Sequence, residues 1–362
     1  MKHTYRAAAV LAAGTLVLTT AASAQAASVD TSADWLGRQL TNGIVHNDQY
    51  NSEDYGLTAD TALALKAIGG QRATVRQIRG ALSRHVDSWT TGADFGTDDV
   101  YAGSVAKAVV LAEATAGDPR AFGGVNLVTR LQRRVSNVAP TVGRIQDKSG
   151  YGDYANTIGQ SFAARGLTVA GASKAGAATT FLLEQQCAAG FFRLNFAAPA
   201  DAKQGCDAGT ATTSVPDTDV TALAVLNLQA FPKKSPAVRG AITDAVGWLK
   251  RHQKRNGSFG GGTATENSNS NSTGLAGWAL GAAGACTPAS KAASWVRNLQ
   301  VRGAVAGTPY AGQRGAVAYN GAAYRAGKTD GITVESRDQW RRATTQAAPA
   351  LANLSAAACA AR

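Results

Sequence analysis

The hydrophobic positions of this chain follow a helical period and fall into two kinds of segment. One kind carries Arg, Lys and Gln on one face of an amphipathic pattern, as at 73–86 and 127–135. The other kind is rich in Ala and Gly. Because small side chains permit close backbone approach, these Ala- and Gly-rich helices are predicted to lie inside and the amphipathic ones outside. Strand-like alternation hardly occurs. The Ala- and Gly-rich segments are 55–70, 99–117, 153–171, 217–230, 271–284 and 314–327.

The two kinds of segment alternate as six outer–inner pairs of roughly 45 to 60 residues each. Asp, Asn, Thr or Ser near the start of an inner segment supplies an N-cap, and glycine closes nearly every one. We predict an all-α fold, an (α/α)6 toroid with an inner ring of parallel helices inside an outer ring. An open α-solenoid is the alternative, and the ring is favoured because no polar terminal cap is evident.

One short pattern occurs twice in full, in "WLKRHQKRNGSF" (248–259) and "FLLEQQCAAGFF" (181–192). A glutamine follows the leading aromatic by five positions, a glycine comes four residues later, and a phenylalanine two after that. Partial copies lie at 295–303, with Gln300, and at 35–43, with Gln39. The repeat residues are Gln186, Gly190, Phe192, Gln253, Gly257 and Phe259.

This glutamine–glycine–phenylalanine turn resembles the QW repeat of the terpene cyclase and protein prenyltransferase superfamily. "PDTDVTALAVL" (216–226) is similar to the start of an inner helix in those toroids and in the related cobalamin-carrier barrels. The resemblance covers essentially the whole mature chain and implies the toroid fold. It also implies structural roles for the six repeat residues, with the glutamine tying helix ends together and the aromatic ring packing on the next turn.

The chemistry of that superfamily is only partly retained here. Prenyltransferases hold zinc with an Asp, a Cys and a His at inner-helix starts, and no cysteine of this chain lies at such a position, so no metal site is expected. Class II cyclases protonate an alkene with the middle acid of a D-x-D-D motif. The matching stretch is Asp217-Thr218-Asp219-Val220, which lacks the last acid. If the chain is a cyclase-like enzyme, Asp219 and Asp217 are its catalytic pair. If it is not, the two carboxylates serve only to cap the helix that begins there.

A ligand site is predicted where the inner helices begin, because their N-termini should surround one mouth of the barrel. The Gly-, Ser- and Asn-rich stretch 256–273 is expected to form a polar loop at this mouth. Asp153 with Tyr151 and Tyr154 is the cluster that would suit a glycan-acting enzyme. The candidate ligand-binding residues are Asp60, Asp99, Tyr101, Asp153, Tyr154, Asp217, Asp219, Glu266, Asn267, Asn269, Asn271 and Trp278.

The N-terminus matches a Sec-type secretory signal peptide. Lys2 and Arg6 precede an apolar stretch that runs to about Leu18, and 24–26 form a small-x-small cleavage site. Cleavage after Ala26 would leave 336 of the 362 residues, with the net charge reduced from +12 to +10 by the loss of Lys2 and Arg6. The charge is spread along the chain, which favours weak attraction to anionic cell-wall polymers or an acidic partner over nucleic-acid binding. We predict a secreted protein without a membrane span.

Four cysteines in a secreted chain favour two disulfides. Pairing neighbours gives Cys187–Cys206 and Cys286–Cys359. The predicted organisation is a signal peptide at 1–26 and a single toroid domain at 27–362. Within that domain we expect a disulfide-stapled insert near 187–216, the polar loop 256–273 and a C-terminal tail helix at 334–354.

We therefore expect a secreted toroid that binds a small molecule or a partner protein at one mouth and does no chemistry. By fold analogy with the cobalamin carriers, the ligand would be corrinoid-like, and no other cofactor is expected. Those carriers have a small β domain for which this chain has no room, so a separate β-domain protein or a membrane transporter would complete the site. The alternatives are a cyclase-like enzyme using 217–220 and a glycan-acting enzyme or cell-wall-associated scaffold.

Overall fold

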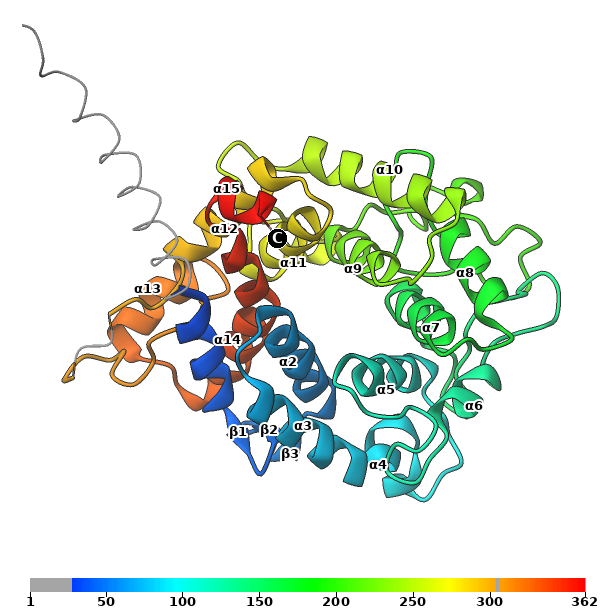
Figure 1. Ribbon diagram of the computed structural model, residues 1–362, viewed down its shortest axis with the longest axis horizontal. Coiled ribbons are helices and arrows are strands. Elements are labelled where there is room, and N and C mark those ends of the chain that lie inside the picture. Colours follow the sequence, from blue (N-terminus) through cyan, green and yellow to red (C-terminus); the bar gives the residue numbers. More distant parts are fainter. Residues whose placement is uncertain (1–27, 304–305, 362) are drawn as a thin grey trace, which may run out of the picture.

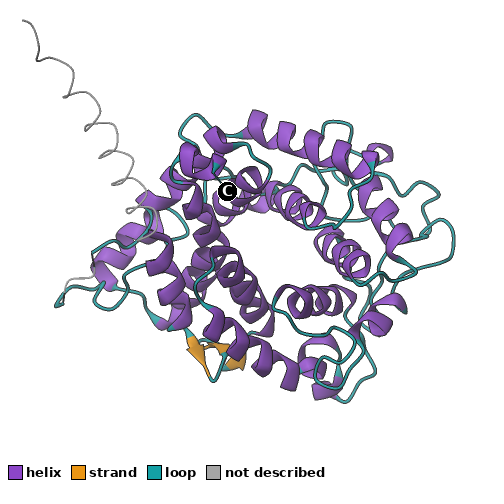
Figure 2. Cartoon of the chain, viewed as in Figure 1, coloured by secondary structure: helices purple, strands orange, loops and turns teal. Residues whose placement is uncertain are grey.

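The computed structural model describes residues 28–303 and 306–361, which form two concentric rings of helices (Figure 1). The predicted signal peptide at 1–26 lies outside the described residues. Helices make up both rings, and the strands are confined to one edge (Figure 2). The predicted all-α toroid is confirmed.

Six helices form the inner ring, and each packs against the next one along the ring. The last of them contacts both its predecessor and the first, so the ring is closed and the solenoid alternative is wrong (Figure 1). The inner helices are α2 (Tyr55–Ile68), α5 (Ala102–Ala114), α7 (Thr157–Val169), α9 (Thr218–Gln229), α11 (Ser270–Ala282) and α14 (Val334–Ala347).

The outer ring surrounds these helices, and the hydrophobic core fills the space between the two layers. Its members are a helix at 28–37, α3 (Arg72–Arg84), α4 (Val86–Thr90), α6 (Leu127–Gln132), α8 (Ala175–Glu184), α10 (Pro236–His252) and α12 (Cys286–Asn298). Strands β1 (Leu40–Thr41), β2 (Ile44–Asn47) and β3 (Ser52–Glu53) form a small antiparallel sheet in the order β1-β2-β3. The remaining elements are α13 (Gly321–Asp330), α15 (Ala356–Ala360) and the 3-10 turns η1 (Ala93–Phe95), η2 (Cys206–Ala208), η3 (Thr263–Thr265) and η4 (Ala348–Asn353).

The sixth inner helix lies in a different place from the one predicted. The small-residue segment 314–327 does not join the inner ring; it runs into α13, where Gly327 is the only buried residue. The inner position belongs to α14, within the segment expected to be a tail helix. Its Trp340, Ala343 and Ala347 are buried, while its Arg337 and Arg342 pair with Asp48 and Asp54, which precede α2.

The two full copies of the repeat turn each tie one outer helix to the next one. Gln253 donates from its Nε2 to the carbonyl of Gly257 in its own turn (3.0 Å) and to the carbonyl of Pro288 in α12 (2.9 Å). Gln186 makes the same two bonds, to Gly190 (2.9 Å) and to Ala241 of α10 (2.9 Å). The glutamine side chain is thus a bridge between neighbouring repeats.

The partial copies of the repeat differ in their partners. Gln300 donates to the carbonyl of Ser28 (2.7 Å) and to the Ser32 hydroxyl (2.6 Å), which joins α12 to the helix at 28–37 and closes the outer ring. Gln39 instead donates to Trp35 within its own turn (3.2 Å). Three of the four copies therefore link successive outer helices.

The aromatic residue of the turn points into the core, and its backbone holds the following inner helix. Phe192 and Phe259 are fully buried. The Phe192 amide donates to the Thr221 hydroxyl of α9 (3.0 Å), and the Phe259 amide to the Thr273 hydroxyl of α11 (2.9 Å). Each threonine lies four residues after its helix's N-cap, so the turn sets the depth of the inner helix in the ring.

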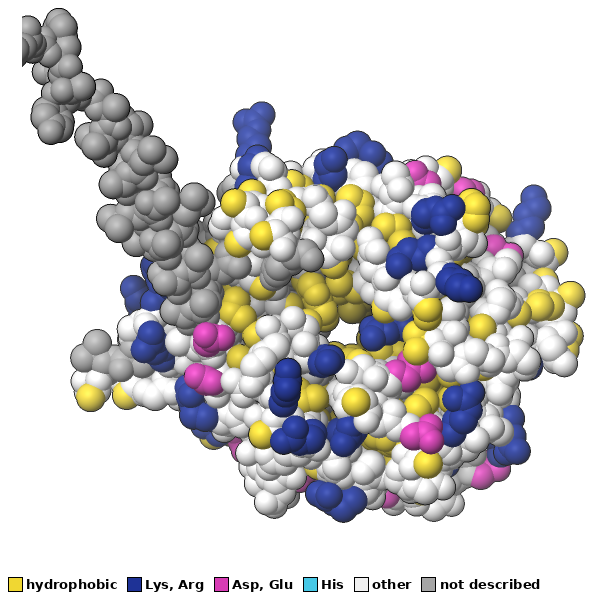
Figure 3. Space-filling model, viewed as in Figure 1, with side chains coloured by type: hydrophobic (Ala, Val, Ile, Leu, Met, Phe, Trp, Pro, Cys, Tyr) yellow, Lys and Arg dark blue, Asp and Glu magenta, His cyan; other side chains and the backbone are white. Residues whose placement is uncertain are grey.

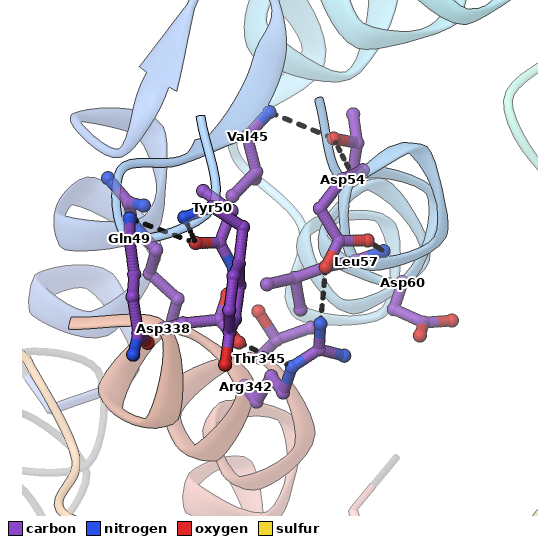
Figure 4. Close-up of polar contacts among 12 residues, drawn as sticks. Val45, Gln49, Tyr50, Asp54, Leu57, Asp60, Asp338, Arg342 and Thr345 are labelled. Carbon is purple, nitrogen blue, oxygen red and sulfur yellow. Dashed lines mark hydrogen bonds and ion pairs between the residues drawn. The ribbon is translucent and has the colours of Figure 1, made fainter. Parts of the chain in front are cut away.

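The seam between α2 and α14 is held by charge (Figure 4). Asp54 caps α2 by accepting from the Leu57 amide (2.8 Å), and its second oxygen pairs with Arg342 of α14. Arg342 also binds Asp338 one turn earlier (2.8 Å). This network joins the first inner helix to the last.

Both disulfides occur in the predicted neighbour pairing, Cys187–Cys206 and Cys286–Cys359. The first staples the insert that precedes α9, where the fully buried Arg193 guanidinium donates to Gln185 Oε1 (2.8 Å) and to the Gln204 carbonyl (2.6 Å). The second fixes α15 to the start of α12.

Candidate functional site

The inner ring encloses a central cavity of about 590 Å³. The space-filling view shows an opening at the centre of the molecule with hydrophobic side chains in its wall (Figure 3). A cavity of this size and character suits a small, largely apolar molecule. The large apolar residues that line it are Leu63, Ile158, Phe162, Leu223, Leu226, Leu275 and Trp278.

The register of the caps decides which residues face the cavity. The side chains of Asp54, Asn156, Asp217 and Asn269 cap α2, α7, α9 and α11. At 100° per residue, the position six after the cap points the same way in each parallel helix. In each of these four helices, the residue at that position lines the cavity. In α5 the N-cap position is Tyr101, and the residue six positions later lines the cavity too. The five residues are Asp60, Lys107, Phe162, Leu223 and Leu275.

Three cations and one acid interrupt the apolar wall. Asp60 and Lys107 form an ion pair across α2 and α5, with Nζ 2.8 Å from Oδ1. Lys66 and Arg165 also line the cavity, and neither has an acidic partner within 4.0 Å among the described residues. The cavity wall therefore carries an excess of positive charge.

Arg165 is the more buried of the two cavity cations that lack an ion-pair partner among the residues described, since Lys66 is exposed. Its Nη1 lies 3.4 Å from Asn227 Oδ1, and its buried Nε has no hydrogen-bond partner in the described part of the chain. The nearby Glu113 forms no ion pair with it within 4.0 Å. Burial raises the pKa of Glu113 to about 8 despite the attraction of Arg165. Burial in turn lowers the pKa of Arg165.

A second cavity of about 370 Å³ lies at the mouth where α5 and α7 begin. It shares Lys107, Ile158 and Phe162 with the central cavity. We call it the mouth cavity. Its remaining wall is more polar, and its lining residues include Trp89, Tyr101, Ser104, Asp147, Tyr154 and Asn156.

The aspartate pair of the cyclase alternative lies at the start of α9. Asp217 is the N-cap, accepting from the amides of Asp219 (2.8 Å) and Val220 (3.1 Å). Burial and, second, the charge of Asp217 raise the pKa of Asp219 to about 7, and its shielded Oδ1 has no partner among the described residues. Neither side chain lines the central cavity or the mouth cavity.

Replacing Asp219 with asparagine is expected to change how stability depends on pH. The folded chain holds the Asp219 proton more tightly than the unfolded chain, where its pKa is near 3.9. Its contribution therefore favours folding at low pH and is lost as the pH rises from about 4 to about 7. Relative to Asp219→Asn, wild type should lose up to about 4 kcal/mol over that range. Urea unfolding from pH 4 to 8.5 measures this, with exposed Asp244→Asn as control; parallel wild-type and Asp219→Asn profiles would contradict it.

The polar loop is folded down onto these aspartates. A Cβ on Gly261 would lie 3.2 Å from Asp219 Oδ2, and one on Gly262 would lie 2.5 Å from Asp217 Oδ2. Only glycines can approach the two carboxylates this closely. Glu266 and Asn267 are exposed in the loop, Asn269 is the buried cap of α11, and Asn271 is half-buried with its Oδ1 unpaired among the described residues.

The other predicted residues divide between the cavities and the scaffold. Asp60 and Trp278 line the central cavity, and Tyr101 and Tyr154 line the mouth cavity. Asp99 is buried and accepts from the Gly150 amide (3.3 Å). Asp153 pairs with Arg144 (3.0 Å) and accepts from the amides of Asp147 and Ala155.

The described residues contain no group of three or more His, Cys, Asp or Glu that could hold a metal ion. No helix within 28–303 and 306–361 is long and apolar enough to cross a bilayer.

The chain matches no family model and no curated protein. Its structure is similar to that of the type II terpene cyclase MstE from Scytonema bound to its product merosterolic acid A. The TM-score is 0.61 at 13% identity, over 93% of this chain and 98% of that one. The fold of this chain is that of the terpene cyclase α/α toroids.

Two further structures share this toroid. A glycosidase in complex with glucose has a TM-score of 0.54 at 14% identity, over 91% of this chain and 97% of that one. A protein from Actinoplanes has a TM-score of 0.58 at 16% identity, over 91% and 99%. The resemblance predicted from the repeat turns is thus confirmed at the level of the fold.

The sequence prediction did not include Lys107, Arg165 or the leucines of the central cavity, because it was based on acidic residues at helix starts. The spacing from each N-cap would have identified most of these positions. Counting six residues on from each cap reaches the wall of the cavity, and Arg165 lies nearly one turn further along α7.

Proposed function

We propose that this toroid binds a small amphiphile, with an apolar body and an acidic head, in its central cavity and does no chemistry on it. The observation that carries the proposal is the apolar wall interrupted by Arg165, a cation without an acidic partner within 4.0 Å among the described residues. A carboxylate or phosphate head would compensate Arg165 while the apolar body packs against Phe162, Leu226 and Trp278.

The energetics favour a ligand whose apolar chain is of moderate length. Each buried methylene contributes about 0.8 kcal/mol, so ten contribute about 8 kcal/mol before the costs of immobilisation. The ion pair with Arg165 adds selectivity for an acid, because a charge left unpaired in a low-dielectric wall is costly.

Replacing Arg165 with glutamine should weaken binding of an acid but not of its alcohol. Displacement of the neutral probe N-phenyl-1-naphthylamine gives the affinities for dodecanoate and dodecanol. We expect Arg165→Gln to weaken dodecanoate binding about tenfold and to leave dodecanol unchanged, because only the acid loses a charge-assisted contact. Arg76→Gln, at an exposed site on α3, is the control. Equal losses for acid and alcohol, or no displacement by either, would refute the proposed head-group contact.

A second candidate is a cyclase-like enzyme with Asp219 as the proton donor to an alkene. It is favoured by the raised pKa and the unpaired Oδ1 of Asp219, and by the fold shared with a type II terpene cyclase. Against it stand Val220 in place of the last acid and the position of Asp219 outside the cavity wall. Cyclised product from an isoprenoid substrate, lost in Asp219→Asn, would establish this candidate over simple binding.

We also propose that the protein acts outside the cytoplasm, which its two disulfides support. N-terminal sequencing of the exported protein should begin at Ala27. A thermal-shift series with a corrinoid beside dodecanoate tests the corrinoid prediction, and a shift with the corrinoid alone would favour it. A separate β-domain protein or membrane transporter remains the predicted partner in that case.

A further inference from the structure

The mouth cavity differs in chemistry from the central cavity. It lies where α5 and α7 begin, and aromatic rings from three separate segments line it: Trp89 of α4, Tyr101 before α5 and Tyr154 before α7. Ser104 and Asn156 also line this cavity. An aromatic wall with a few convergent polar groups is the usual composition of a binding site for a small polar molecule.

Further exposed aromatic side chains lie in the segments that lead into α5 and α7. Phe95, Tyr151 and Tyr154 have 79%, 79% and 73% of their surface exposed. Phe95 ends η1 before α5, and Tyr151 and Tyr154 precede α7. Rings left in water do little for the stability of the fold, so a cluster of them at one mouth indicates contact with a ligand.

Trp89 supplies an unused hydrogen-bond donor in the wall of the mouth cavity. Its side chain is only 7% exposed, and its Nε1–H has no partner among the described residues. An indole nitrogen can only donate, and leaving a buried donor unpaired is costly. A ligand oxygen at the edge of this ring would satisfy it.

We propose that the mouth cavity is a saccharide-binding site, distinct from the amphiphile site of the central cavity although the two cavities share Lys107, Ile158 and Phe162. The apolar C–H faces of a sugar ring pack on tyrosine rings, and its oxygens can accept from Trp89. The nearby carboxylates are already engaged: Asp147 accepts from the amides of Ala102 (2.6 Å) and Tyr154 (3.1 Å), and Asp153 pairs with Arg144. Asp147 is the one carboxylate among the described residues that line this cavity, so the lining offers no pair of carboxylates for glycoside hydrolysis, and we expect binding without cleavage.

Calorimetric titration of the mature chain with chitotriose, cellotriose and maltotriose tests the site. For whichever trisaccharide binds, Tyr154→Ala should weaken affinity at least tenfold, because it removes the exposed stacking ring. Trp89→Phe keeps an aromatic ring but removes the N–H, and should weaken affinity about fivefold. Tyr50→Ala is the matched control, since Tyr50 is equally exposed but lies outside the cavity lining, and its affinity should stay within twofold.

The outcomes separate this site from the central cavity. Dodecanoate affinity should be unchanged in Tyr154→Ala, and saccharide binding should persist in Arg165→Gln. Absence of heat with all three trisaccharides for folded wild type would overturn the proposal, as would equal losses in Tyr50→Ala and Tyr154→Ala. A parallel loss of dodecanoate and saccharide in Tyr154→Ala would overturn the separateness of the two sites.

Discussion

Replacing Gly257 with alanine is expected to lower the free energy of unfolding by about 3 kcal/mol. Gly257 has φ of +90°, and a Cβ there would lie 2.5 Å from the carbonyl oxygen of Lys291 in α12. The left-handed conformation costs an alanine about 1–2 kcal/mol, and forcing the turn away from α12 adds to this. The displacement would also stretch the bond from Gln253 to Pro288, which joins the two repeats.

Gly284 offers a matched control for this measurement. Its φ is +74°, but nothing lies within 4 Å of the position that a Cβ would take. Gly284→Ala should therefore show the conformational cost alone, about 1 kcal/mol. Urea unfolding of both variants gives the comparison, and equal destabilisation would show that the close approach to α12 contributes nothing.

Filling the central cavity should strongly weaken binding of its proposed ligand. Leu226 lines the cavity from α9 and is only partly buried, so a tryptophan there would extend into the open space. Every methylene excluded from the cavity loses about 0.8 kcal/mol, so we expect Leu226→Trp to weaken dodecanoate binding at least thirtyfold. Displacement of N-phenyl-1-naphthylamine measures the loss.

A tryptophan at Leu183 is the control that distinguishes filling of the central cavity from a general disturbance of the fold. Leu183 is partly buried in α8 of the outer ring and does not line the cavity. Leu183→Trp should leave dodecanoate affinity within about twofold of wild type. If it weakened binding as much as Leu226→Trp, the central cavity would not be the binding site.

The fold could be predicted because its repeated element is local. Gln253, Gly257 and Phe259 lie within seven residues and make their contacts through one turn, so sequence spacing alone identifies them. The sixth inner helix could not be found this way. α14 is rich in Arg, Asp and Glu, and only partners such as Asp54, far away in the sequence, make those charges compatible with an inner position.

The candidate site was less predictable, for a physical reason. Asp153, Asp217 and Asn269 stand out in the sequence as polar residues at helix starts, but their oxygens accept backbone N–H groups there. Residues such as Leu223 and Leu275 look like ordinary core positions. Whether a leucine faces the core or the cavity depends on the rotation of its helix within the ring, and that rotation is set by tertiary contacts.

The ion pair between Asp54 and Arg342 also determines when the central cavity can form during folding. The two residues are 288 positions apart in the sequence. The wall of the central cavity is incomplete until α14, which contributes to its lining, has packed into the inner ring. Contacts between such distant residues form late, because a large loop must close first. In the export that we propose, a chain still leaving the translocation pore would have an incomplete cavity wall, and the proposed ligand could not be enclosed until α14 (Val334–Ala347) had emerged and packed against α2.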